Sequence, residues 1–230
     1  MAEFLQNLSL FPLLLTIGSY QVGLWCRKKT GSALCNPLLI GVLICIGVLL
    51  LIGMEPGVYI AGNDGISWLL TPATVCLAVP LYEQMKVLKG NLAAVFAGIF
   101  AGTLTSLVCV FLLCRLFGLD QTLSVSLLPK SVTAAIGTVL TENAGGIPSL
   151  TAAAIMLTGI LGNLTGTYLC KWLRITDPIA QGVGFGTASH AIGTARANEL
   201  DPLVGAVSSL SLAVAGILTA VVFPLMLMLL

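Results

Sequence analysis

The stretch GFGTASHAIGTAR, residues 184–196, places a histidine and an arginine among glycine, alanine and small hydroxyl residues. His190 is the one histidine of the chain, and Arg196 follows it in the same small-residue segment. Side chains this small leave space around ionisable groups, and glycine weakens a continuous helix. The surrounding segment, 178–200, is therefore predicted to be an interrupted helical hairpin.

The rest of the chain is strongly apolar. Of its 230 residues, 57% are hydrophobic and 8% are charged, and the mean hydropathy is +1.05. Soluble domains carry about a quarter charged residues, so this chain is predicted to be an all-α membrane protein surrounded by lipid. Its net charge of +1 argues against a nucleic-acid partner. The seven cysteines lack C-x-x-C spacing and predict neither a disulfide framework nor a metal site, and no cofactor is expected.

About six helices are expected to span the membrane, because a span needs about 20 apolar residues. The charge-free runs are 4–26, 34–54, 65–82, 90–114, 149–170 and 203–230. Two further apolar stretches, 121–146 and 178–200, contain ionisable residues. Positive loops favour the cytoplasm, which places both Arg27–Lys29 and Lys171–Arg174 inside. With both basic loops inside, segment 121–146 has to enter and leave the membrane on the same side, as a re-entrant hairpin.

An internal repeat accompanies these hairpins. The sequence AIGT occurs at 135–138 and 191–194, and GIL occurs at 159–161 and 216–218. We expect two units, each a hairpin followed by a span, inverted relative to each other as in many secondary transporters. Residues 119–230 would then form the transport region, and residues 1–118 a scaffold for a homodimer. Gly98 and Gly102 offer one possible dimer face.

The ionisable and hydroxyl residues of the two hairpins are the candidate site. Lys130 and Arg196 are expected to hold a substrate carboxylate, and Gly193 to leave room for it. His190 would be the pH-sensitive member. The other candidate substrate-binding residues are Ser131, Thr133, Thr187, Ser189 and Thr194, and Glu142 and Glu199 are candidates, with His190, for proton coupling or ion pairing.

Structural alternatives stay open for each charged group. Lys130 could pair with Glu142, Arg196 could pair with Glu199 three residues later, and His190 could be a hydrogen-bonded packing residue. Catalysis is not expected, because neighbouring residues on a helix, such as Ser189 and His190, point about 100° apart and so do not form a nucleophile–base pair.

Several of these motifs resemble the LrgB family over nearly the whole chain after the first helix. The motifs are LCNPLLI (34–40), LTPATVCLAVPLYEQ (70–84), LPKSVT (128–133), GGIPSLTA (145–152) and GTASHAIGTARANELD (186–201). One departure is that the family commonly has Thr-Pro after Lys-Ser-Val-Thr, where this chain has Ala134 and Ala135.

The resemblance implies one of two functions in a bacterial cell (inner) membrane. The first is transport of small monocarboxylates such as glycolate, glycerate, lactate or pyruvate. The second is antiholin-like regulation of murein hydrolase export and autolysis, together with a small LrgA-type membrane partner. Two small-residue hairpins that carry Lys, His and Arg favour transport by alternating access, with the substrate between the hairpin tips.

Overall fold

The computed structural model describes residues 10–229 except 31–36, 70, 71, 73, 74 and 77. Every element in this part of the chain is a helix. The helices divide into two compact units, Met1–Cys76 and Leu77–Leu230, which are described separately.

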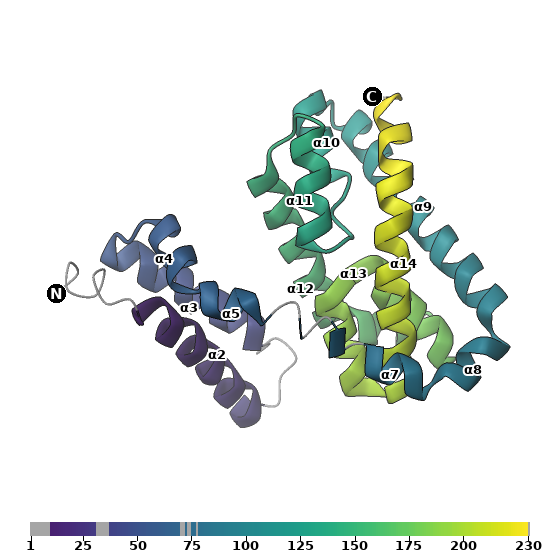
Figure 1. Ribbon diagram of the computed structural model, residues 1–230, viewed down its shortest axis with the longest axis horizontal. Helices are drawn as coiled ribbons and strands as arrows, with labels where there is room; N and C mark the ends of the chain where they lie inside the picture. The colour runs from purple at the N-terminus through teal and green to yellow at the C-terminus, as the bar shows by residue number, and fades with distance from the viewer. Residues whose placement is uncertain (1–9, 31–36, 70–71, 73–74, 77, 230) are drawn as a thin grey trace. The chain divides into compact units, whose positions relative to one another are not determined.

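The first unit is built on two neighbouring helices. α2 (Phe11–Thr30) and α3 (Pro37–Ile52) lie side by side (Figure 1), followed by the short α4 (Pro56–Gly62) and α5 (Asp64–Trp68). The helices approach closely where side chains are absent, because a Cβ atom on Gly23 would lie 2.8 Å from the Cα of Pro37. Glycine at such a contact lets apolar helices pack backbone to backbone.

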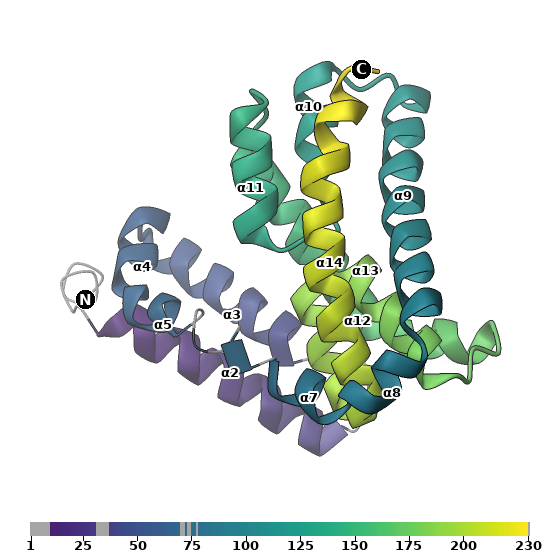
Figure 2. The same ribbon diagram turned by 45° about the vertical axis from the view of Figure 1, so that its right-hand side comes forward.

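The second unit contains the candidate site. Its helices are α7 (Ala78–Glu83), α8 (Met85–Gly90), α9 (Leu92–Leu116), α10 (Gln121–Leu127), α11 (Ala134–Asn143), α12 (Pro148–Trp172), α13 (Pro178–Leu200) and α14 (Pro202–Leu227). α14 packs along α13 and α9, and α12 packs against α13 (Figure 2). The candidate residues of both hairpins therefore lie within one packed body.

Aspartate and proline set the start of the last two helices. The carboxylates of Asp177 and Asp201 accept hydrogen bonds from the backbone N–H groups of Ala180 at 2.8 Å and Leu203 at 2.7 Å. Pro178 and Pro202 follow as the first helical residues, where a missing N–H costs nothing. Asp177-Pro178 thus begins α13, and Asp201-Pro202 begins α14 directly after α13 ends at Leu200.

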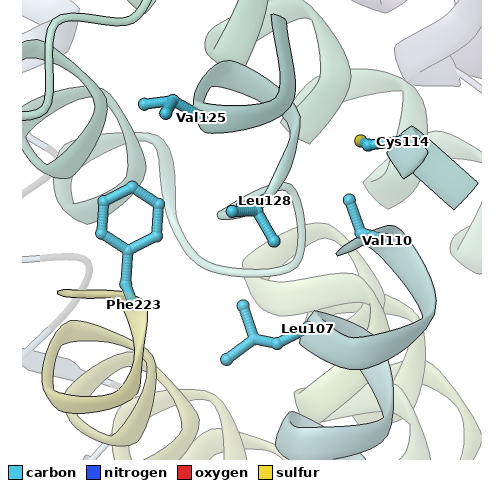
Figure 3. Close-up of a cluster of buried hydrophobic side chains, with 6 residues drawn as sticks. All are labelled: Leu107, Val110, Cys114, Val125, Leu128 and Phe223. Atoms are coloured by element: carbon cyan, nitrogen blue, oxygen red, sulfur yellow. The ribbon is translucent and has the colours of Figure 1, made fainter. Parts of the chain in front are cut away.

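A buried apolar cluster joins the end of α14 to α9 and α10. Its members are Leu107, Val110, Cys114, Val125, Leu128 and Phe223. Figure 3 shows these side chains converging from α9, α10 and α14. The cluster holds the residues that follow α10 against the two long helices, and so fixes the segment that leads to Lys130.

Three helices are long and apolar enough to cross a membrane among the described residues: α9, α12 and α14. They match the spans predicted at 90–114, 149–170 and 203–230. The span predicted over 65–82 falls partly on residues 70, 71, 73, 74 and 77, which lie outside the described residues; in the described part, α5 ends at Trp68 and α7 begins at Ala78. α2 overlaps the span predicted at 4–26 and extends past its end, and α3 lies within the one predicted at 34–54, so the expected number of six spans stays a prediction.

The two predicted hairpins share a local geometry. α10 and α13 each begin a helix–break–helix segment, and a long helix follows each segment, namely α12 and α14. The glycine of AIGT lies against an earlier carbonyl in both: a Cβ on Gly137 would be 3.3 Å from the oxygen of Pro129, and one on Gly193 would be 2.9 Å from that of Phe185. A regular helix carries residues eight apart about 12 Å along its axis, so the chain reverses direction in both segments.

The first reversal forms without the Thr-Pro sequence common in the family. α11 begins at Ala134, with Thr133 in extended conformation before it. Buried hydroxyls close the hairpin instead: Thr151 of α12 donates to the Ser126 carbonyl and bonds to Thr141, each at 2.8 Å. These contacts join α10, α11 and α12 beside the break.

The two compact units meet between residues 76 and 77, whereas the predicted functional division lies at residue 118. α9, assigned above to the scaffold, packs on α13 and α14 within the second unit. The suggestion that Gly98 and Gly102 form a dimer face is wrong, because Cβ atoms on them would contact Val183 and Thr187 of α13 at 3.2 Å and 3.0 Å. The homodimer and the functional division at residue 118 stay predictions.

Labelling of single cysteines tests the orientation of the two hairpins. In a cysteine-free background we expect Gln121→Cys and Ile147→Cys to react with an impermeant maleimide added outside the cell. Thr176→Cys and Leu200→Cys should react only after the cytoplasmic face is opened. All four positions are exposed. Labelling of Gln121→Cys and Ile147→Cys from opposite sides would exclude the re-entrant hairpin.

Candidate functional site

His190 is the point at which α13 reverses. Its backbone has φ 42° and ψ −139°, whereas the residues on either side are helical. A positive φ is uncommon outside glycine, and such strain persists only where surrounding contacts over-determine it. The predicted interruption of 178–200 is therefore present, and it is centred on the histidine that identified the segment.

Side chains from two neighbouring helices hold this reversal. The ring Nε2 of His190 bonds to the Ile155 carbonyl of α12 at 2.9 Å. Asn163 of α12 donates to the Ile192 carbonyl at 3.1 Å, and Thr194 bonds to Ser208 of α14 at 2.8 Å. His190 is 3% exposed, so its side chain fixes the break from within the protein.

A row of glycines on α12 makes room for the reversal. A Cβ on Gly159 would lie 2.7 Å from the ring of His190, one on Gly162 would collide with Ser189, and one on Gly166 would collide with Phe185. Small residues at such positions allow close helix contact in a membrane. The groove that they form explains why a helix of this chain carries so many glycines.

A cavity of about 360 Å³ lies beside the break. Lys130, which follows α10, and Ser189, which precedes the break in α13, both line it. The other lining residues are Thr158, Gly162, Gly166, Leu169, Cys170, Leu173, Ile175, Gly184, Phe185 and Ala188. Small-molecule sites typically combine apolar walls with a few polar groups in about this volume.

Lys130 is the charged group of this cavity. Its ammonium donates to the hydroxyl of Ser131 at 2.9 Å, and the side chain is half-buried. Glu142, the acid proposed as its alternative partner, lies exposed in the last turn of α11. Lys130 is therefore bonded to a neutral hydroxyl, and an ammonium group has three donor hydrogens.

Arg196 lies elsewhere. Its guanidinium forms an ion pair with Glu199 at 2.6 Å, and it is not among the residues that line the cavity of Lys130. The structure thus brings Lys130 and Ser189 together, whereas Arg196 adopts the i, i+3 pairing that was the structural alternative. Binding of a carboxylate by Arg196 stays a prediction.

The remaining candidates lie in three different surroundings. Gly193 and Thr194 are inside the reversal, where Ser189 and the Phe185 carbonyl fill the space next to Gly193. Thr187 donates to the Val183 carbonyl at 2.7 Å and faces α9. Thr133 precedes α11 without capping it through its side chain. Space for a ligand is thus provided beside Gly184 and Gly162, not beside Gly193.

We did not predict Asn163, Ser106 or Ser208 as site residues from the sequence. Ser106 of α9 bonds to Ser131 at 2.9 Å, next to Lys130. A polar residue within an apolar span is itself a signal of an interior contact, and this signal could have identified Asn163. No three His, Cys, Asp or Glu side chains gather around a metal-sized space in the part of the chain that the structure describes.

Similarity to known proteins extends over nearly all of these elements. A family model described as the LrgB-like family matches residues 16–229. The chain is 35% identical to holin-like protein CidB of Staphylococcus aureus (strain N315) over 221 residues, which are 96% of each protein.

Two further relatives also match over nearly their whole length. Over 229 residues the chain is 36% identical to holin-like protein CidB of Staphylococcus epidermidis (strain ATCC 12228), covering 100% of this chain and 99% of the relative. It is 30% identical to uncharacterized protein YxaC of Bacillus subtilis (strain 168), covering 95% of each. No solved structure matches the chain. With its apolar helices and this full-length similarity, the chain is a membrane protein that belongs to the LrgB-like family.

Proposed function

We propose that this chain is a holin-like protein of the bacterial cell (inner) membrane that regulates murein hydrolase export and autolysis. The observation that carries the proposal is its end-to-end similarity, at 35–36% identity, to proteins named holin-like protein CidB. Coverage of 96% or more of those relatives leaves no additional domain of theirs to account for a separate activity. An LrgA-type small membrane protein is the partner that we propose.

Complementation tests this function. Expression of the chain in Staphylococcus aureus that lacks its CidB protein is expected to restore the autolysis rate and the murein hydrolase bands of zymograms. His190→Ala should fail to restore them, because it removes the bond to Ile155 that holds the break in α13. Lys171→Met, at an exposed position, is the matched control and should complement fully. Unchanged autolysis on expression of the wild-type chain, at confirmed membrane levels, would count against the proposal.

The cavity beside Lys130 favours a second candidate function, the transport of a small monocarboxylate. Insertion scales give a cost of about 2.5–3.5 kcal/mol for a charged side chain at the centre of a bilayer. A bound anion with one negative charge would offset this cost, since the cavity is lined by one ammonium and by neutral groups. Leu169, Leu173 and Phe185 supply an apolar wall for the rest of such a ligand.

Counterflow into proteoliposomes separates the two candidates. Labelled glycolate, glycerate, lactate and pyruvate should exchange into vesicles that contain the pure chain if it is a carrier. Gly184→Phe is expected to block exchange, because Gly184 lines the cavity and no atom lies within 4 Å of its added Cβ. Failure of all four acids to exchange, in vesicles where the protein is folded, would remove the carrier and leave the holin-like function untouched.

A further inference from the structure

A second, much smaller cavity is lined by Ser131, the residue that follows Lys130. Its volume is about 10 Å³, and it is enclosed by α9, the residues between α10 and α11, α13 and α14. Five hydroxyl residues line it: Thr103, Ser106, Ser131, Thr187 and Thr219. We call this cavity the hydroxyl chamber. So many hydroxyls around so small a space in a buried, otherwise apolar region require an explanation.

Thr103 has a buried hydroxyl that no described residue satisfies. The residue is 4% exposed, and its Oγ1 has no hydrogen-bond partner among the described residues. An unbonded buried hydroxyl destabilises a fold, because it has lost its hydrogen bonds to water. A helix can satisfy a threonine through its own carbonyls, as Thr187 does with Val183, but Thr103 does not do so.

The hydrogen bonds around the chamber define which groups donate into it. The ammonium of Lys130 only donates, so the Ser131 oxygen accepts and its hydrogen is available to Ser106 at 2.9 Å. Either hydroxyl can donate in this bond: with Ser131 as the donor the hydrogen of Ser106 is left for an acceptor within the chamber, and with Ser106 as the donor its oxygen still accepts there. Thr187 uses its hydrogen on the Val183 carbonyl, so its oxygen can only accept there.

The occupant that fits these groups donates to the Thr187 oxygen and accepts from the hydroxyls of Ser106 or Thr103. A monovalent cation cannot accept, and the ammonium of Lys130, 2.9 Å from one lining oxygen, would repel it. An anion cannot donate to Thr187. Water does both, and a cavity of about 10–15 Å³ on this measure holds one water molecule.

We propose that the hydroxyl chamber binds one water molecule, which accepts from Ser106 and donates to Thr187 and Thr103. The water completes a hydrogen-bonded chain that runs from the ammonium of Lys130 through Ser131 and Ser106 to α13. This chain holds Lys130 at the break after α10 and connects it to the first half of α13. The proposal requires neither candidate function, because it concerns an internal site of the fold.

Water-edited solid-state NMR of the full chain in lipid vesicles tests the proposal directly. Threonine signals of Thr103 and Thr187 are expected to gain several-fold more intensity from water, at short mixing times, than those of Thr141 and Thr151. The latter two are a matched control, because they are 0% exposed and their hydroxyls bond to each other at 2.8 Å. Equal transfer to Thr103 and Thr141 would overturn the water site.

Valine at position 103 gives a second readout. It keeps the shape of threonine but removes one bond to the water, and we expect the Tm in detergent to fall by about 2–4 °C, the effect of one lost hydrogen bond in a chain of this size. Thr105→Val, on the exposed side of the same helix, should leave the Tm unchanged. An unchanged or higher Tm for Thr103→Val would mean that the hydroxyl has no water partner, and would contradict the proposal. Should the variant not fold, the NMR measurement on the wild-type chain decides.

Discussion

Gly193→Val is expected to disrupt the reversal in α13 and to destabilise the second unit by about 3 kcal/mol, at the upper end of overpacking effects. The added Cβ alone would lie 2.5 Å from the Cβ of Ser189 and 2.9 Å from the carbonyl oxygen of Phe185. One of these contacts is backbone, so no side-chain rotation relieves it. The sequence alone predicts that this substitution blocks a ligand and leaves the fold intact, and the contacts predict the opposite. Thermal unfolding in detergent, followed by size-exclusion chromatography, measures the effect.

Gly184→Val is the matched control for this prediction. Gly184 lies in the same glycine-rich segment, is exposed, and has no atom within 4 Å of an added Cβ. Its substitution should change the free energy of unfolding by no more than about 0.5 kcal/mol, as at ordinary surface positions. Equal Tm values for the two variants would mean that residues 185 and 193 are not in contact, and that α13 does not reverse at His190.

The long helices of the second unit could be predicted from the sequence because hydropathy and length determine them locally. α9, α12 and α14 follow uninterrupted apolar runs, and a span needs little besides such a run. The segment 65–82 is also charge-free, but five of its residues lie outside the described part of the chain, so this span stays a prediction.

The candidate site could be predicted only where one segment determines it. The small residues around His190 indicated the break, and the i, i+3 spacing of Arg196 and Glu199 indicated that the two could form an ion pair. The bonds of Asn163 to Ile192 and of Ser106 to Ser131 join residues 29 and 25 positions apart. No local pattern specifies such partners. The hydroxyl chamber and the hydrogen bonds that hold the break could therefore be found only from the packing of the helices.

Lys130→Met is expected to separate function from stability, because it removes the ammonium and keeps a side chain of similar length. If the cavity holds a monocarboxylate, truncating one partner of a buried charge pair costs about 2 kcal/mol or more. This corresponds to a loss of affinity of about 30-fold or more. Flux of labelled acid into proteoliposomes, as a function of concentration, measures the loss. The same substitution should raise the Tm without ligand, since no charge then has to be removed from water.

Lys171→Met supplies the comparison that makes the two effects specific to Lys130. Lys171 lies exposed in the last turn of α12, so its removal should change neither transport nor Tm. For Lys130→Met we expect weaker transport but a higher Tm. A charged group kept for ligand binding destabilises the fold when no ligand is bound. A structural ammonium, needed only for its bond to Ser131 at 2.9 Å, would behave differently. Its loss would lower the Tm and leave transport unchanged, and that result would assign Lys130 to the fold rather than to a binding site.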